Sequence, residues 1–259
     1  MRLRPPVALA WAAACWACED PNAPERPGVD AAGTDGAGTD AALPDAAMEP
    51  PGRLRWTLAW DLTGLEPVEG APGFSVVTNL GYQVHLRDGT VTTWDASLLP
   101  CDGPKNHGPD TNETSADVAV VESLHAPLPA LPWSVREGLV GDYCQGHLVV
   151  ARADRNSLSD GRALVRDRIS LHLELQVTSN SDATWVREVS LDAAFSYGAV
   201  LPLPVGLAPL SFTERSIDLR LTRFARTLFD DIDLTGSTDE NLGRDVLRNL
   251  VLDSRLTVD

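Results

Sequence analysis

The chain has 259 residues, a formal net charge of -16 at pH 7 and an isoelectric point near 4.6. Such an excess of acidic residues disfavours binding to nucleic acid or to anionic lipid surfaces, since both select basic patches. No stretch approaches the roughly 18 consecutive apolar residues that a membrane-spanning helix requires. We therefore expect neither a nucleic-acid-binding protein nor a transmembrane helix.

The N-terminus has the features of a lipoprotein signal peptide. Arg2 and Arg4 form a positive start, and the apolar run Val7–Ala17 follows. Its length falls in the range of about 7–15 residues that is typical of secretory signals. Cys15 and Cys18 each follow small residues, as in a lipobox, where the cysteine is lipidated. We favour Cys18 because it gives the longer apolar run, and an ordinary cleaved secretory signal is the alternative.

The chain therefore divides into a signal peptide (1–18), a tether (19–52) and a folded domain (53–259). The tether consists largely of Ala, Gly, Pro, Thr and Asp, with eight acidic residues and one arginine. Such a segment cannot bury enough apolar surface to offset the entropy of ordering, so we expect it to be disordered. It would hold the domain away from a membrane to which the lipid is attached.

In the domain, apolar and polar residues alternate with a period of two. The runs are Leu54–Leu62, Leu80–Leu86, Ile169–Val177 and Ile217–Leu221. This pattern places one face of each strand in a core and the other in solvent, as in antiparallel sheets. Asp88-Gly89 predicts a hairpin turn, and Asn180–Asp182 predicts another. We expect an all-β fold, an antiparallel β-sandwich of prealbumin or immunoglobulin type.

One helix is predicted near the C-terminus, over residues 239–252. Ser237 and Glu240 form a capping box, and apolar residues follow at helical spacing. A last strand is expected at residues 256–258. The helix should cover an open edge or end of the sandwich, where an exposed strand would otherwise favour aggregation.

Cys101 and Cys144 are the two cysteines that follow the leader. In the oxidising compartment that lies beyond an export signal, we expect a disulfide between them, with free thiols or metal ligands as alternatives. Closing the loop between them would contribute on the order of 3–4 kcal/mol of stability in the chain-entropy account.

Three histidines, His107, His125 and His147, lie in or just after this loop. Neutral imidazoles suit copper or zinc, so these residues are the candidate metal ligands. The alternative is that they are ordinary surface histidines, because tight ligand spacing is absent. His85 and His172 fall on the polar faces of their predicted strands, and we expect both to be solvated.

A second metal candidate is Asp231–Asp239, which places oxygen side chains at several positions of an EF-hand-like loop. Leu242 occupies the position where such a loop needs a bidentate glutamate, so a helix cap explains the segment better. Motifs of nucleophilic, phosphate-binding or zinc-dependent enzymes are absent, and we expect no enzymatic activity.

Several segments resemble exported bacterial β-sandwich proteins of the MbnP-like copper-binding group. They are Phe74–Leu86, Trp94–Cys101, Gly141–His147, Leu228–Leu234 and Asn249-Leu250, within residues 54–258. In that group a tryptophan and cysteines matter to the copper site. Trp94 is the residue of this chain to compare with that tryptophan, whereas the group's four-cysteine pattern is absent. The resemblance implies a periplasm-facing sandwich that handles copper or accompanies a haem peroxidase.

We therefore predict a lipid-anchored protein of the bacterial cell envelope, on the outer membrane or the periplasmic face. The first functional hypothesis is binding of copper, or another transition metal, through the loop histidines. The second is a metal-free adhesion or carbohydrate-binding module that uses Trp133 or Trp185 as a stacking platform. The third is a structural partner of another envelope protein.

Overall fold

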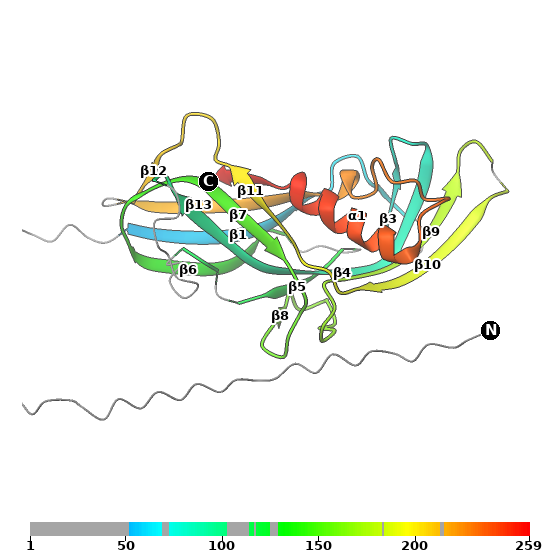
Figure 1. The fold of residues 1–259 in the computed structure, drawn as a ribbon, viewed down its shortest axis with the longest axis horizontal. Helices are drawn as coiled ribbons and strands as arrows, with labels where there is room; N and C mark the ends of the chain where they lie inside the picture. The colour runs from blue at the N-terminus through cyan, green and yellow to red at the C-terminus, as the bar shows by residue number, and fades with distance from the viewer. Residues whose placement is uncertain are drawn as a thin grey trace, which may run out of the picture. The chain divides into compact units, whose positions relative to one another are not determined.

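The computed structural model describes residues 52–68, 73–102, 114–116, 118–124, 129–182, 184–212 and 215–259. Within them, the chain forms two β-sheets and one α-helix (Figure 1). This confirms the all-β class with a C-terminal helix. The predicted signal peptide, the lipidation candidates Cys15 and Cys18, and the tether up to residue 51 lie outside the described residues. None of the described helices is long and apolar enough to cross a membrane.

The first sheet has four strands in the order β14-β13-β1-β6. Their bounds are β1 (Gly52–Asp61), β6 (Leu131–Leu139), β13 (Ser216–Phe224) and β14 (Arg255–Val258). β1 pairs in parallel with β13, a departure from the purely antiparallel sandwich that the alternation predicts. The alternation itself cannot tell the two pairings apart, because side chains point to opposite faces in both.

The second sheet has ten strands, and most of them pair directly or indirectly with β4 (Tyr82–Pro100). The others are β2 (Glu66–Pro67), β3 (Phe74–Val77), β5 (Val120–Ser123), β7 (Asp142–Val150), β8 (Leu158–Ser159), β9 (Leu171–Ser179), β10 (Val186–Ala193), β11 (Tyr197–Pro202) and β12 (Leu210–Ser211). The order β10-β9-β4-β3-β2 covers one half of the sheet. In the other half, β7 pairs with β4, β11 and β12, while β5 pairs with β4 and, in parallel, with β8.

The hairpin predicted at Asp88-Gly89 is wrong, because both residues lie inside β4. The register with β9 shifts between Leu86 and Asp88, which leaves Arg87 as the extra residue of a bulge. Pairing with β9 continues on both sides of the bulge, so ladder hydrogen bonds outweigh the local turn preference. The turn predicted at Asn180–Asp182 is confirmed between β9 and β10.

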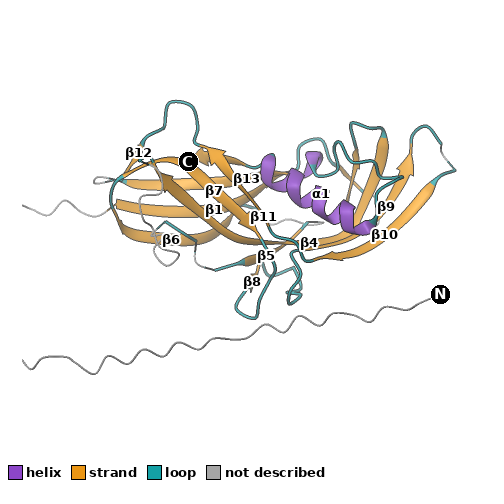
Figure 2. Cartoon of the chain, viewed as in Figure 1, coloured by secondary structure: helices purple, strands orange, loops and turns teal. Residues whose placement is uncertain are grey.

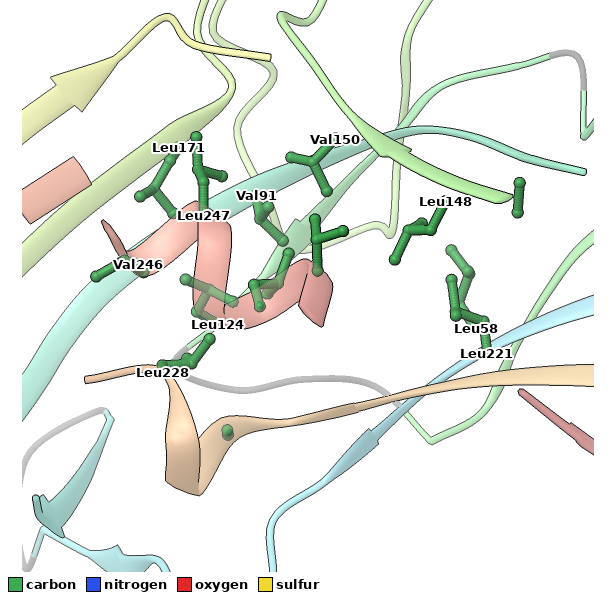
Figure 3. Packing of buried hydrophobic residues seen from close by; sticks show 14 of the residues in the cluster. Leu58, Val91, Leu124, Leu148, Val150, Leu171, Leu221, Leu228, Val246 and Leu247 are labelled. Carbon is green, nitrogen blue, oxygen red and sulfur yellow. The ribbon is translucent and has the colours of Figure 1, made fainter. Parts of the chain in front are cut away.

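One continuous core fills the space between the sheets and the helix. The predicted apolar faces of β1, β9 and β13 are buried, as the alternation requires. Figure 3 shows Val246 and Leu247 of the helix among Leu124, Leu171 and other core side chains. Burial of this apolar surface is the main driving force for the fold.

The helix α1 (Asp239–Leu252) has the predicted bounds and packs on β10 and β11 (Figure 2). β10 is the edge strand of its half of the sheet, and the helix packs on its buried face, which carries Leu191 and Ala193. Gly243 makes this approach close, since a Cβ there would lie 2.8 Å from Ala193 Cβ. The N-cap is Thr238 rather than Ser237, and Thr238 Oγ1 accepts from Asn241 N at 3.2 Å.

A charged pair is buried between the two sheets. Arg223 of β13 has no exposed surface, and its guanidinium forms a two-point ion pair with Glu122 of β5. Thr93 Oγ1 of β4 donates to Glu122 at 2.8 Å and accepts from Arg223 at 2.7 Å. The guanidinium also lies 4.6 Å from the ring centroid of Trp60. The pair therefore links both sheets in one register.

The acidic segment before α1 is a turn whose carboxylates accept internal hydrogen bonds. Asp233 Oδ1 accepts from Thr235 N, Thr235 Oγ1, Gly236 N and the Tyr82 hydroxyl. Asn79 donates to Asp231 Oδ1 at 2.8 Å. These bonds fasten the 230–236 turn to the turn between β3 and β4. They also give Asp231 and Asp233, which the EF-hand-like spacing suggested as calcium ligands, a structural role in this turn.

We expect Glu122→Ala to lower the free energy of unfolding by about 3–5 kcal/mol, because it leaves the guanidinium of Arg223 buried without a counter-charge. The double variant Glu122→Leu/Arg223→Met should recover most of this loss, since it removes both charges. Urea unfolding with the disulfide intact measures both. If the free energy of unfolding of Glu122→Ala lay within about 1 kcal/mol of the wild-type value, the pair would not be buried away from water as described.

Hydrogen bonds from the Thr235 and Tyr82 side chains lower the pKa of Asp233 to about 2. Because this pKa is depressed on folding, the carboxylate stabilises the fold fully above its ordinary value of 3.8, and the contribution disappears as the pH falls toward 2. Asp233→Asn should therefore lower the Tm at pH 7 and change it little at pH 2. Thermal melts of the variant and the wild type across this pH range measure the effect. An equal Tm difference between the two proteins at pH 7 and pH 2 would contradict the lowered pKa of Asp233.

Candidate ligand-binding pocket

The structure describes one of the three predicted metal ligands. His147 lies on β7, half-buried, opposite Ser97 of β4 and Val200 of β11. His107 and His125 lie outside the described residues. Among the described side chains, no three His, Cys, Asp or Glu residues gather as metal ligands. The predicted histidine site therefore stays a prediction.

The expectation that His172 is solvated is wrong, since it is only 3% exposed. Its Nδ1 lies 2.8 Å from Asp192 Oδ1, and its Nε2 lies 3.2 Å from Arg166 Nη2. A guanidinium only donates, so Nε2 accepts and Nδ1 carries the proton that it shares with Asp192. The segment between β7 and β9 covers this ring, and the alternation within β9 could not show that cover. His85 is half-buried on β4.

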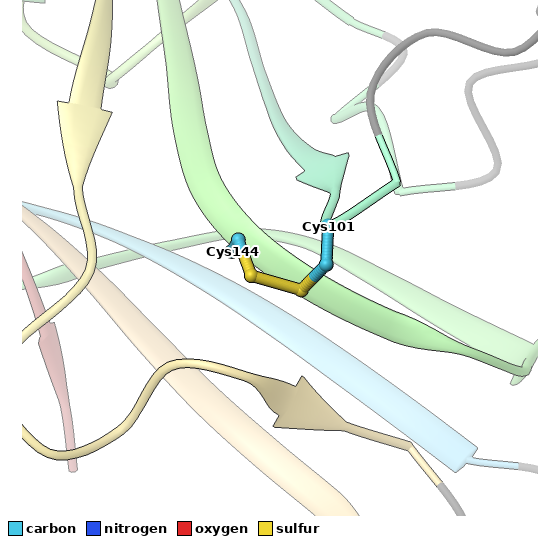
Figure 4. Close-up of a disulfide and its surroundings, with 2 residues drawn as sticks. All are labelled: Cys101 and Cys144. Carbon is cyan, nitrogen blue, oxygen red and sulfur yellow. A yellow bond between two sulfur atoms is a disulfide. The ribbon is translucent and has the colours of Figure 1, made fainter.

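The predicted disulfide between Cys101 and Cys144 is present (Figure 4). It joins the end of β4 to β7, where Cys101 N also donates to Asp142 O at 3.1 Å. The register between these strands shifts here, so Cys144 is the extra residue of a bulge. The bond fixes both ends of the long segment between the two cysteines, whose later part forms β5 and β6.

A pocket of about 460 Å³ lies at the part of this segment that precedes β5. This volume falls within the range of roughly 300–1,000 Å³ that small-molecule sites occupy. Its lining residues come from β4, the segment before β5, β7 and the turn after β7. They are Trp94, Asp95, Ser115, Val118, Ala119, Val149, Asp154 and Asn156.

Trp94 is placed in the pocket by a bulge in β4. Thr93 pairs with Val150 and Asp95 pairs with Val149, so Trp94 has no partner on β7. Bulges re-aim the side chain of the extra residue. Trp94 is 38% exposed in a protein whose other described tryptophans are buried or half-buried. The pocket therefore has an exposed aromatic face.

One wall of the pocket is held from behind by side chains of the four-stranded sheet. Trp56 Nε1 donates to Thr114 O at 2.9 Å, and Trp133 Nε1 donates to Val118 O at 2.7 Å. Arg136 Nε donates to Ser115 O at 2.6 Å. These bonds pin the wall before any ligand arrives, which lowers the entropic cost of binding.

Asp95 is the charged group beside Trp94. Its Oδ1 accepts from Ser115 Oγ at 2.5 Å and from Ala116 N at 3.2 Å. Burial lowers the pKa of Arg136, and the attraction of Asp95 opposes that change. The carboxylate is therefore held in place between the wall and a partly buried cation.

The turn after β7 supplies another part of the lining. Asp154 Oδ1 accepts from Asn156 N at 2.8 Å and from Ser157 Oγ at 3.1 Å. The backbone returns alongside this turn, because Arg168 N donates to Ala153 O at 2.8 Å. A carboxylate and an amide therefore join Trp94 and Asp95 in the lining of the pocket.

The arrangement suits binding of a small ligand with an apolar face and several hydroxyl groups. The indole offers a flat apolar surface, the carboxylates accept from hydroxyl groups, and Asn156 both donates and accepts. The other two predicted platforms are half-buried: Trp133 donates to the pocket wall, and Trp185 packs on Tyr82. The sequence carried no signal for the bulge that selects Trp94 instead.

Comparison with known proteins gives one structural match. The chain is similar to MbnP from Methylosinus trichosporium, with 14% sequence identity, coverage of 74% of this chain and 83% of that chain, and a TM-score of 0.32. No protein-family model matches the chain, and no curated protein matches it. The weak resemblance to MbnP-like proteins that the sequence suggested is thus also found among solved structures.

Proposed function

We propose that this chain is a lipid-anchored protein of the bacterial cell envelope that binds a carbohydrate in the Trp94 pocket and performs no catalysis. The observation that carries the proposal is the preformed pocket, which is lined by an exposed indole together with Asp95, Asp154 and Asn156. The apolar face of a sugar ring stacks on an indole, while its hydroxyl groups bond to carboxylates and amides.

The disulfide supports an extracytoplasmic location. Cys101 and Cys144 are bonded, and structural disulfides persist in oxidising compartments. The N-terminal sequence supports export and a lipid anchor at Cys18 or Cys15, followed by an acidic tether. A tethered domain of this kind would meet glycans of the envelope or of the cell's surroundings.

Copper binding through His107, His125 and His147 is the second candidate. One observation favours it: the disulfide fixes the chain six residues before His107 and three residues before His147. An extended chain reaches at most about 3.6 Å per residue, so His147 lies within roughly 11 Å of Cys144. Neutral imidazoles would supply suitable ligands for copper.

For the carbohydrate site, Trp94→Ala should weaken glycan binding at least tenfold, because stacking on the indole is lost. Trp94→Phe should retain part of the affinity, since it keeps an aromatic face. Binding of residues 53–259 to a panel of immobilised oligosaccharides, followed by calorimetry, measures this effect. Unchanged Tm values serve as the folding control, and equal binding by the alanine variant would exclude Trp94 from the site.

For the metal site, the same domain should bind copper stoichiometrically at micromolar concentration if the histidines converge. His147→Ala should then lose that binding. His85→Ala should keep it, because His85 lies near the start of β4, far along the strand from Ser97, which pairs with His147. Copper titration with the disulfide intact tests this candidate. Full binding by the His147 variant, or none by the wild type, would remove it.

A further inference from the structure

The described lining of the Trp94 pocket carries negative charge and no positive charge. Asp95 and Asp154 are its charged residues, and none of its described members is Arg, Lys or His. Trp94 supplies an aromatic face, and Val118 and Val149 supply apolar side chains. A recess that is lined by charge of one sign and has apolar walls focuses the electric field and concentrates ligands of the opposite sign.

Asp154 keeps one carboxylate oxygen for a ligand. Its Oδ1 accepts from Asn156 N at 2.8 Å and from Ser157 Oγ at 3.1 Å. Its Oδ2 has no hydrogen-bond or ion-pair partner among the residues that the structure describes. Arg155, the next residue, is exposed and is not among the residues that line the pocket. Within the described part of the chain, the charge of Asp154 is therefore not paired with a cation.

Asp95, which follows Trp94 in β4, is held in a similar way. Its Oδ1 accepts from Ser115 Oγ at 2.5 Å and from Ala116 N at 3.2 Å, and its Oδ2 has no partner among the described residues. Arg136 attracts this carboxylate from the pocket wall, where its Nε donates to Ser115 O. The protein therefore balances part of the charge of Asp95, and we expect Asp154 to be the stronger anchor for a cation.

A neutral ligand would leave the charges of the pocket without compensation. A ligand that fills the pocket removes water from both carboxylates, and removing water from an unpaired charge is costly. Hydroxyl groups replace only part of that hydration, whereas an ammonium group supplies both N–H donors and a compensating charge. The indole adds to this preference, because the face of a tryptophan ring attracts a cation. Both features favour a ligand with a positive charge.

We infer that the ligand of the Trp94 pocket is an amino sugar whose amine is free and protonated, as in oligomers of glucosamine. This inference rests on the proposed carbohydrate-binding function and specifies the substrate class. The apolar face of the sugar ring stacks on the indole, and the ammonium group donates to Oδ2 of Asp154 and of Asp95. An N-acetylated sugar lacks this charge and binds less tightly, and a uronate is repelled by the same carboxylates.

The test compares oligomers of glucosamine and of N-acetylglucosamine that have equal length, so that they share one sugar backbone and differ in charge. In calorimetry at low salt and in slightly acidic buffer, residues 53–259 should bind the glucosamine oligomer about tenfold more tightly than the acetylated one. That advantage should shrink in roughly 0.5 M salt, because the ion pairs of an open pocket are screened.

Variants locate the charge that is responsible. Asp154→Asn should remove most of the preference for the amine, and Asp95→Asn should reduce it less, because Arg136 already balances part of that charge. An asparagine keeps the Oδ1 acceptor of each turn, so both variants should retain the wild-type Tm. The control Glu188→Gln/Glu240→Gln removes two charges from β10 and α1 and should leave the preference intact. Loss of the preference in the control, or its retention in Asp154→Asn, would overturn the inference.

The other possible failures are distinguishable. If neutral glycans bind through Trp94 and amino sugars have no advantage, the inference fails while the pocket keeps its proposed function. If glucosamine oligomers bind equally to the wild type and to Trp94→Ala, or if oligolysine binds as tightly as they do, the acidic protein attracts cations in general and the inference fails. If no glycan binds, both proposals fail.

Discussion

The buried pair of Arg223 and Glu122 is the constraint on which the arrangement of the two sheets depends. Removing a guanidinium and a carboxylate from water costs several kcal/mol for each ion, and good geometry must recover that cost. Here β13 of one sheet supplies the cation, while β5 and β4 of the other supply the carboxylate and Thr93. A sliding of the sheets by one residue would leave both charges buried and unpaired. The main effect of the pair is therefore to fix the position of one sheet relative to the other, and its net contribution to stability is secondary.

The same docking prepares the pocket. With the sheets in register, Trp56, Trp133 and Arg136 of the four-stranded sheet donate to backbone carbonyls of Thr114, Val118 and Ser115 beside β4. Two of these side chains are tryptophans, and their indole N–H groups donate to carbonyl oxygens. The chain uses its buried aromatic residues as supports and leaves Trp94 to face the ligand space.

The net charge of the chain does not describe how its charged residues are distributed. A net charge of -16 argues against anionic partners for the molecule as a whole. The segment between β7 and β9, however, holds five arginines and three aspartates. Asp154 and Asp160 accept hydrogen bonds that shape its turns, and Asp167 pairs with Arg168.

The sequence by itself determined the all-β class, the buried faces of β1, β9 and β13, the bounds of α1 and the Cys101–Cys144 bond. Strand alternation and helix capping depend on neighbouring residues alone, and the domain has only two cysteines that can pair with each other. Only the tertiary structure decided that Asp88-Gly89 continues a strand, that His172 is covered, and that β1 pairs in parallel with β13. It also selected Trp94, since a bulge in one strand and a wall pinned from the other sheet create the pocket. Each of these outcomes depends on partners far away in the chain, and no local pattern of residues specifies which partner a strand will meet.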